Sequence, residues 1–371
     1  IIAEVLIEQG VDTIFGYPGG AVLNIYDALY KYRDKIHHIL TAHEQGASHA
    51  ADGYARATGK TGVVIATSGP GATNLVTGIA TAYMDSIPMV AITGNVGTSY
   101  IGKDAFQEVY ITGITMPITK HNFFVSDIKE LAPTLREAFK IANSGRKGPV
   151  LVDIPKDVTA AITEYEKAAP EVIIDNTVIN EDEVKKAAAL INKAKRPVIE
   201  IGGGVVSSEA SDLVRMLVNK TGAPCCHTLM AAGVLGFSEK LNYGLVGMHG
   251  SFVTNKAIDE ADVLVAIGTR FSDRVALNTN RFAHKAKVIQ IDIDLSEIDK
   301  NVKVDHALVG DVKTIVMDLL HYVKQSDRTD WLKTLDEYKN SDYHPVDSDK
   351  YITPHQLIRA ICENVPKDTV Y

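Results

Sequence analysis

Apolar strand patterns alternate with helical patterns along nearly all of the 371 residues. This alternation predicts βα units and parallel sheets, because a helix must carry the chain from the end of one parallel strand to the start of the next. In the first part of the chain, the expected strands are 13–16, 36–41, 62–67, 89–93, 122–125 and 150–154, of which 36–41 is expected to be buried. The expected helices of this part are 22–30, 44–58, 72–83 and 128–143.

The alternating pattern is interrupted once and then resumes. Residues 160–180 lose the periodicity, which predicts a linker. The resumed pattern has expected strands 198–201, 224–227, 263–267 and 288–293 and expected helices 181–194, 208–221, 252–260 and 312–324. We predict two successive parallel-sheet α/β domains, at 1–160 and 181–326, joined by a linker at 161–180. Residues 327–371 are expected to form a polar linker and, with a helix at 354–363, the start of a third domain.

Composition excludes several classes of protein. A net charge of -8 provides no basic surface for nucleic acid, and no apolar run approaches the roughly 18 residues that span a membrane. Three cysteines, two of them adjacent, predict free thiols in a reducing cytoplasm and no disulfide framework. The chain starts at Ile1 inside a helical pattern and stops at Tyr371 where a strand pattern begins, so we expect a fragment of a longer polypeptide.

Glu44 is the leading candidate for chemistry. It follows the expected strand 36–41, and the glycine-rich turn Ser68-Gly69-Pro70-Gly71 follows the expected strand 62–67. The carboxyl ends of parallel strands share one edge of the sheet, where open α/β sheets bind ligands. A partly buried glutamate there would have a raised pKa and could hold or pass a proton near neutral pH. The alternative is a carboxylate at a helix start that only interacts favourably with the helix dipole.

Other segments of the first part offer binding surface beside Glu44. The two glycines of Ser68-Gly69-Pro70-Gly71 allow the backbone to approach a flat ligand, or they serve an ordinary turn. Asn74 would orient a ligand or cap a helix. The turn Tyr17-Pro18-Gly19-Gly20-Ala21 leaves space beside its backbone, and Phe106 and Gln107 lie either on a mobile segment or at an ordinary loop-to-helix boundary.

The second part contains further candidate binding segments, three of which lie at the ends of expected strands. Gly202-Gly203-Gly204 partly matches a dinucleotide fingerprint, or is a tight turn. The two arginines of 270–274 suit a diphosphate, or are solvated surface residues. Gly247-Met248-His249-Gly250 could pass along a flat ring, although a lone histidine is more often structural. Asp292 and Asp311 could meet ribose or ribityl hydroxyls, or cap helices.

Together these segments resemble the thiamine-diphosphate-dependent carboligases, and most closely the catalytic (large) subunits of acetohydroxyacid (acetolactate) synthases. The resemblance runs in order through the whole chain and is carried by Tyr17-Pro18-Gly19-Gly20-Ala21, His43-Glu44-Gln45-Gly46-Ala47, 67–74, 101–108, 148–158, Gly247-Met248-His249-Gly250 and Arg270-Phe271-Ser272-Asp273-Arg274. It implies that the first domain binds the aminopyrimidine of thiamine diphosphate and that the second is a Rossmann-like central domain that holds FAD.

The resemblance also implies a reaction and residue roles. Pyruvate would be decarboxylated and its two-carbon unit condensed with a second 2-keto acid, pyruvate or 2-ketobutyrate, in the biosynthesis of valine, leucine and isoleucine. Glu44 would bind the pyrimidine nitrogen N1′ and control its tautomer, with Gln107 as a second catalytic residue. The pyrimidine site would also include Tyr17, Gly20, Ala21, Pro70 and Asn74, and the substrate channel Phe106, Gln107 and Lys156. The implied FAD contacts are Arg146, Gly202, Gly203, Gly204, Thr228, Leu229, Met230, Met248, His249, Gly250, Gly268, Arg270, Asp273, Arg274, Asp292, Ile293, Asp311 and Val312.

Three departures from the family pattern matter. Gly97 stands where the family usually has proline, in a loop that shapes the substrate and inhibitor channel, and Ser272 replaces the first aspartate of a usual pair. The family anchors the diphosphate and Mg²⁺ through Gly-Asp-Gly in a third domain, whereas here the only Gly-Asp is Gly310-Asp311-Val312. No metal ligand is therefore assigned to this chain, which is expected to be inactive alone. A homodimer or tetramer and a regulatory small subunit are implied partners.

Other readings stay open. A pyruvate oxidase is one, and a glyoxylate carboligase is disfavoured because that enzyme lacks the glutamate that Glu44 provides. The FAD-independent catabolic acetolactate synthases are disfavoured by Tyr17-Pro18-Gly19-Gly20 and by 270–274. A non-catalytic flavin-binding or nucleotide-binding module would gain weight if the natural chain ended at Tyr371.

Overall fold

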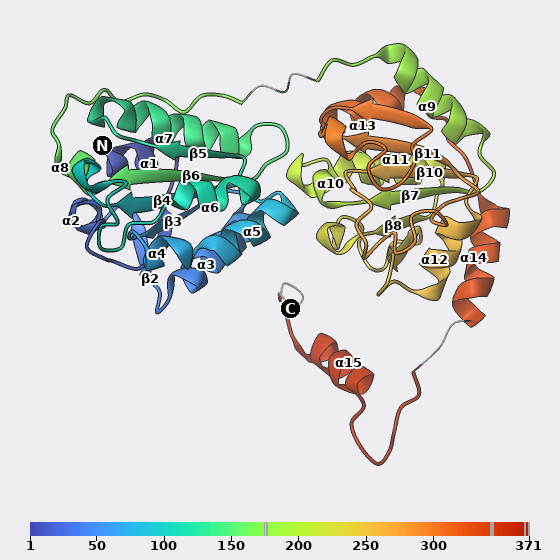
Figure 1. Ribbon diagram of the computed structural model, residues 1–371. Helices are drawn as coiled ribbons and strands as arrows, with labels where there is room; N and C mark the ends of the chain where they lie inside the picture. Colours follow the sequence, from blue (N-terminus) through green and yellow to red (C-terminus); the bar gives the residue numbers. More distant parts are fainter. Residues whose placement is uncertain (174, 176, 342–344, 367–368, 370–371) are drawn as a thin grey trace.

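The chain folds around two six-stranded, fully parallel sheets, which lie side by side in the computed structural model (Figure 1). The structure describes residues 1–371 except 174, 176, 342–344, 367–368, 370 and 371. Each sheet has helices on both faces, as expected for parallel strands joined by helical crossovers. The predicted α/β class is therefore confirmed.

The first sheet has the order β2-β1-β3-β4-β6-β5. Its strands are β1 (Thr13–Gly16), β2 (His37–Leu40), β3 (Gly62–Ala66), β4 (Met89–Asn95), β5 (His121–Phe124) and β6 (Pro149–Pro155). Successive residues of β3, β4 and β6 enter two different hydrophobic cores because side chains alternate along a strand. One core is shared with α1 (Ile2–Glu8), α2 (Leu23–Lys31) and α7 (Ile128–Asn143). The other is shared with α3 (Glu44–Thr58), α4 (Pro70–Thr73), α5 (Val76–Asp85) and α6 (Ile111–Thr115).

The second sheet has the order β12-β11-β10-β7-β8-β9. Its strands are β7 (Pro197–Ile201), β8 (Cys225–His227), β9 (Asn242–Leu245), β10 (Val263–Ile267), β11 (Lys287–Asp292) and β12 (His306–Val309). One face packs on α9 (Glu181–Lys193), α10 (Gly203–Ser207), α11 (Ser211–Thr221) and α13 (Val312–Tyr322). The other face packs on α12 (Phe252–Glu260) and α14 (Thr329–Ser341).

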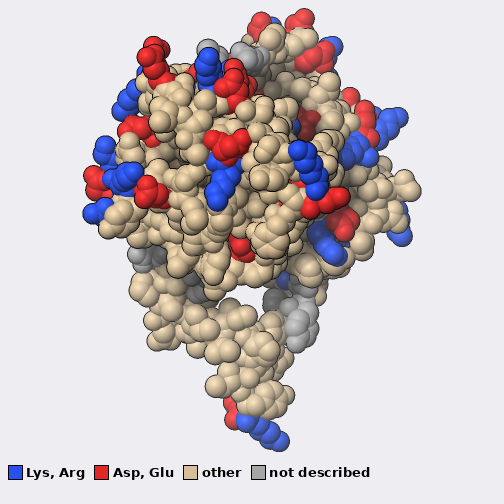
Figure 2. Space-filling view, turned by 60° about the vertical axis from the view of Figure 1, so that its left-hand side comes forward, with Lys and Arg blue, Asp and Glu red and all other residues tan. Residues whose placement is uncertain are grey.

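The segments outside the two sheets are short helices and extended chain. Between α8 (Lys156–Ala160) and α9, the described residues contain no helix or strand, and this strap crosses from the first sheet to the second (Figure 1). The helix α15 (Pro354–Asn364) has no buried residue. None of the described helices is both long enough and apolar enough to cross a membrane. Positive and negative side chains are interspersed over the face shown in Figure 2.

Several expectations about the elements were wrong. The strand expected to be buried at 36–41 is the edge strand β2, where Ile39 is 37% and Leu40 63% exposed, because an edge strand has a neighbour on one side only. The single helix expected at 72–83 is divided into α4 and α5, and that at 208–221 is preceded by the separate α10. The polar stretch from 327 contains the helix α14, whose Trp331 and Leu335 are buried.

Candidate functional site

The order of the first sheet creates a ligand crevice between β1 and β3. From β1 the chain continues to β2 at the edge of the sheet, and it then returns to form β3 on the other side of β1. The helices that follow β1 and β3 therefore cover opposite faces of the sheet. Such switch points are where open α/β sheets bind ligands. The turn after β1 lies directly on Thr67, which follows β3: the Ala21 amide donates to Thr67 Oγ1 at 3.1 Å. A Cβ on Gly19 would lie 2.5 Å from the Thr67 Cβ, so this approach requires glycine.

Glu44 lies at this crevice as the first residue of α3. The side chain of His43 caps the helix, because its Nδ1 accepts a hydrogen bond from the Gln45 amide at 3.0 Å. The Asn74 amide group donates to Glu44 Oε2 at 3.0 Å. The other oxygen, Oε1, accepts no hydrogen bond from the described residues, and a Cβ on Gly71 would lie 3.2 Å from it. The expected meeting of Glu44 with the glycine-rich turn is therefore confirmed. The Asn74 side chain holds Glu44, which is neither of the two roles foreseen for Asn74.

The space around Glu44 Oε1 suits a flat, basic ring. A Cβ on Gly20 would meet nothing within 4 Å, so the backbone there is open to a ligand. Tyr17 is 42% exposed at the same turn. A half-buried carboxylate with one fixed and one free oxygen can hold a proton at a ring nitrogen. These residues therefore fit an aminopyrimidine.

Tyr26 is a neighbour of Glu44 that the sequence did not reveal. Burial, and then the charge of Glu44, raise the pKa of its phenol. The Tyr26 hydroxyl is 3.2 Å from His38 Nε2, and a Cβ on Gly16 would come within 2.6 Å of it. No sequence motif marks Tyr26, because its place depends on how α2 packs under the ends of β1 and β2.

The loop 101–108 closes on itself and on the glycine-rich turn. Hydrogen bonds from the amides of Gly102 and Ala105 lower the pKa of the Glu108 carboxyl, which accepts both. Gly69 has a φ of 61°, and a Cβ on it would lie 2.7 Å from the Gln107 carbonyl oxygen. The structure thus brings Gln107 to the turn beside Glu44, while Phe106 in the same loop is 87% exposed.

Lys156 is the first residue of α8 and is exposed at the end of β6. The next residue, Asp157, holds the loop after β4, because its carboxylate accepts from the Thr98 amide at 3.0 Å and from Thr98 Oγ1 at 2.5 Å. Gly97 has φ -58° and ψ 146°, a conformation that proline also adopts. A Cβ on Gly97 would have its nearest neighbour at 3.7 Å. Neither the backbone angles nor a lack of space for a side chain therefore explains why glycine replaces the family's usual proline at position 97.

The second sheet has its own switch point, between β7 and β10. Gly202 and Gly204 follow β7 and pack against Gly268, which follows β10. A Cβ on Gly202 would lie 2.3 Å from the Gly268 carbonyl oxygen, and one on Gly204 would lie 2.6 Å from the Gly268 Cα. A Cβ on Gly203 would lie 3.1 Å from the Cβ atom of Met230. Gly202 and Gly204 thus form a tight turn with a close backbone approach at the crevice, which agrees with both readings of this segment.

The structure also gathers the segments predicted to lie beside a flavin. The Met248 amide donates to the Arg274 carbonyl oxygen at 2.8 Å, and Arg274 Nη1 lies 3.4 Å from Met248 Sδ. These segments follow β9 and β10 at the same edge of the sheet. Several of the predicted residues are exposed there and open to a ligand: Leu229, Met248, His249, Asp273, Arg274 and Ile293. Thr228, Met230, Gly250, Gly268 and Arg270 are half-buried at this edge.

Other residues in the predicted flavin set are engaged within the protein. The Asp311 carboxylate accepts a hydrogen bond from the Lys313 amide at 2.8 Å and so caps α13, which was the alternative to a ligand contact. Val312 is buried in the core. Burial raises the pKa of Asp292 to about 6, and its carboxylate accepts from the Asp294 amide at 3.0 Å. Arg146 is held by carboxylates of the second domain.

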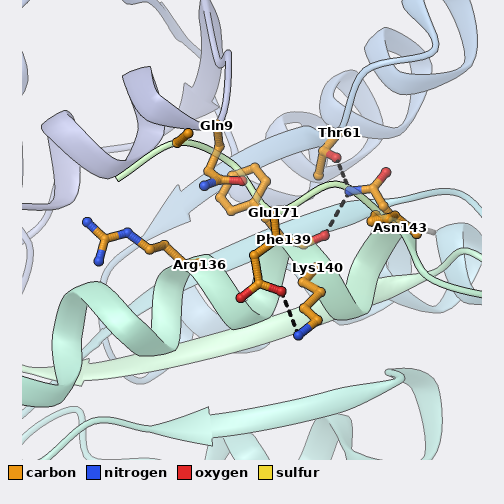
Figure 3. Close-up of a pocket in the computed structure, with 9 residues that line it drawn as sticks. Gln9, Thr61, Arg136, Phe139, Lys140, Asn143 and Glu171 are labelled. Carbon is orange, nitrogen blue, oxygen red and sulfur yellow. Dashed lines mark hydrogen bonds and ion pairs between the residues drawn. The ribbon is translucent and has the colours of Figure 1, made fainter. Parts of the chain in front are cut away.

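A pocket of about 180 Å³ lies at the opposite edge of the first sheet. It is bounded by α7 and the strap, with Asn143 bonded to Thr61 and Lys140 paired with Glu171 at 2.7 Å (Figure 3). Thr61 directly precedes β3, whereas the Glu44 crevice lies beyond the carboxyl ends of the strands. This pocket is therefore separate from the candidate site.

Comparison with known families finds a match for each of the two sheet domains. Residues 1–114 match the thiamine pyrophosphate enzyme N-terminal TPP binding domain, and residues 184–319 match the thiamine pyrophosphate enzyme central domain. The first match contains Glu44 and Asn74, and the second contains the crevice between β7 and β10. The chain belongs to the thiamine pyrophosphate enzymes.

Relatives within this enzyme family cover nearly the whole chain. A probable acetolactate synthase large subunit of Methanocaldococcus jannaschii is 48% identical over 98% of the chain and 63% of its own length. An acetolactate synthase of Mycobacterium leprae is 48% identical over 98% of the chain and 60% of its own length. The acetolactate synthase large subunit of Corynebacterium glutamicum is 44% identical over the full chain and 60% of its own length. The chain thus spans about 60–63% of these relatives.

Proposed function

We propose that this chain is part of an acetolactate synthase large subunit that converts pyruvate and a second 2-keto acid into branched-chain amino-acid precursors. The observation that carries the proposal is Glu44, whose Oε2 is held by Asn74 while Oε1 lies beside Gly71 and accepts no hydrogen bond from the described residues. The similarity to acetolactate synthases narrows the reaction within the thiamine pyrophosphate enzymes.

In this proposal, each part of the crevice has a separate task. Thiamine diphosphate, when bound, supplies a carbon that becomes nucleophilic after losing its proton. Glu44 holds a proton at the pyrimidine nitrogen N1′, and Asn74 keeps the carboxylate oriented. Tyr17, Gly20, Ala21 and Pro70 line the ring. Gln107 acts beside Glu44 and, with Phe106 and Lys156, lines the substrate channel and excludes water.

We further propose that FAD binds at the carboxyl edge of the second sheet. Supporting observations are the close approach of Gly202 and Gly204 to Gly268, the exposed arginine Arg274, and the open Met248-His249 turn. Among the described residues, no group of three or more His, Cys, Asp or Glu side chains is placed to hold a metal ion. We propose that the Mg²⁺ ligands lie outside these 371 residues. We also propose that the two domains span residues 1–160 and 181–326. Assembly into a homodimer or tetramer with a regulatory small subunit is part of the same proposal.

The test is acetolactate formation from pyruvate by the full-length protein supplied with thiamine diphosphate, Mg²⁺ and FAD. The wild type is expected to be active, and Glu44→Gln to lose about 10²–10⁴-fold in kcat, the range typical of a lost acid–base group. The control is Asp27→Asn, which removes the charge of an exposed carboxylate that pairs with Lys31. Acetate or peroxide in place of acetolactate would instead favour a pyruvate oxidase or another carboligase. Flavin binding without turnover would favour a non-catalytic module.

A further inference from the structure

The two domains meet at the end of α5. Ser86 follows this helix in a left-handed conformation, with φ 60° and ψ 42°, and its Oγ accepts a hydrogen bond from Arg146 Nε at 2.8 Å. Arg146 lies in the turn between α7 and β6. Its Nε therefore ties together two segments of the first domain, which leaves the other end of the guanidinium to reach the second domain.

That other end enters a pair of carboxylates. Arg146 Nη1 lies 3.1 Å from Asp294 Oδ2 and 2.5 Å from Glu297 Oε1. Both acids belong to the short turn that follows β11, and the Glu297 side chain is only 2% exposed. A carboxylate removed from water needs a cation or hydrogen-bond donors. Lys300 also reaches Glu297 Oε1, at 2.9 Å, but it lies on the same side of the interface.

The other polar contacts between the domains are weaker. Arg270 Nη2 lies 3.8 Å from Asp85, with both side chains about one-third exposed. Lys147 Nζ donates to the Ser207 carbonyl oxygen at 3.1 Å from an exposed position. Arg56 Nη1 lies 3.6 Å from Met230 Sδ, also at an exposed position. Exposed, loosely spaced pairs contribute little because water and salt screen them. Arg146 thus makes the most buried and most highly connected of these contacts.

We propose that Arg146 is a positioning residue that fixes the second domain on the first by joining Ser86 to Asp294 and Glu297. We call these four residues the Arg146 clamp. Its effect reaches Glu44 through helix packing: α5 lies so close to α3 that a Cβ on Gly78 would come within 2.0 Å of Ser48 Oγ. Tight packing therefore connects the end of α5 to the helix that begins at Glu44. This role differs from the flavin contact that the family resemblance implies for Arg146, and it does not depend on which 2-keto acids react.

The clamp is tested by hydrogen–deuterium exchange of the full-length protein without flavin. In Arg146→Gln, amides on both sides of the interface are expected to exchange at least tenfold faster. These are Ser86 and Ile87 on the first domain and Glu297 and Ile298 on the second, all hydrogen-bonded in the structure. The matched control is Lys147→Gln, which removes the adjacent cation and should leave all four amides unchanged.

A purely flavin-binding role predicts a different result. Arg146→Gln would then lose flavin affinity while its flavin-free form kept wild-type protection at both segments, and the clamp would be overturned. If Arg146→Gln does not fold, Glu297→Gln decides, since it keeps the side-chain shape and removes the buried charge. At least threefold faster exchange at Ser86 and Ile87, across the interface from the substitution, supports the clamp, and unchanged exchange there overturns it.

Discussion

Glu200 is a fully buried carboxyl in the interior strand β7. Its Oε1 accepts from Thr269 Oγ1 at 2.9 Å, and its Oε2 has no hydrogen-bond partner among the described residues. Gln290, two strands away in the same register, donates to the Thr269 carbonyl oxygen at 3.2 Å. Within the described part of the chain, the Gln290 side-chain oxygen also lacks a partner. Burial raises the pKa of Glu200 to about 7, so near neutral pH the Glu200 carboxyl is protonated in part of the molecules.

This group should make stability depend on pH. Below the unfolded pKa near 4.5, Glu200 is protonated in both states; between that value and about 7, only the folded state keeps the proton, so stability falls as pH rises. Relative to Glu200→Gln, the wild type is expected to lose up to about 3 kcal/mol of unfolding free energy between pH 5 and 8. Urea unfolding of both proteins across this range measures the difference, and parallel curves would contradict the ionisation of Glu200.

At the scale of elements, the contact between α3 and α5 sets how Glu44 is held. Gly78→Ala would place a Cβ 2.0 Å from Ser48 Oγ and 3.1 Å from its backbone carbon, so the helices must separate. We expect a loss of about 1–3 kcal/mol in unfolding free energy, as for overpacked cores. Gly53→Ala, within α3 and with nothing within 4 Å, should instead stabilise by about 0.5–1 kcal/mol. Denaturant unfolding of this chain checks both values, and equal effects would show that close packing does not govern Gly78.

Most elements could be predicted because each carries its own periodic signal. Strands rich in buried aliphatic residues, such as β10 (Val263–Ile267), and amphipathic helices, such as α7 (Ile128–Asn143), begin and end at the residues that the pattern indicates. β9 was missed because Asn242–Leu245 is short, half-buried and interrupted by glycine. α14 was missed because its polar residues obscure the spacing of Trp331 and Leu335.

The candidate site was predictable to the extent that it follows strand ends. Glu44, Asn74 and the glycine turns each follow a strand, and parallel topology brings such turns to one edge. The contacts of Tyr26 and Glu297 were not predictable, because they depend on how helices and domains pack, and no local pattern records that. The roles of the predicted flavin residues remain predictions.

At the scale of the whole molecule, the strap between the sheets is anchored at both ends. On the first domain, the buried Glu8 carboxylate accepts from Arg136 Nε at 3.0 Å and from the Ala168 amide at 2.8 Å. On the second, the Asp311 amide donates to Thr177 Oγ1 at 2.7 Å. The strap thus limits how far the domains can separate.

Removing the charge of Glu8 should release the first anchor. Glu8→Gln weakens the ion pair with Arg136 and the hydrogen bond from Ala168, so trypsin is expected to cut after Lys167 about tenfold faster, equivalent to about 1.4 kcal/mol. Limited proteolysis followed by mass spectrometry measures the rate. The control Glu4→Gln changes a glutamate of the same helix that bonds to Tyr32 and does not touch the strap. Equal cleavage rates for the two variants would rule out Glu8 as the anchor.

The lengths of the edge strands have a consequence for solubility. In the described structure, the outer strands of the two sheets, β2, β5, β9 and β12, are each four residues long, whereas the inner strands β4 and β6 have seven. An outer strand exposes unpaired amides and carbonyls that can recruit a strand of another molecule, and a short one offers few places to begin. Lengthening β2, which already exposes Leu40, would therefore be expected to promote aggregation through strand pairing between molecules.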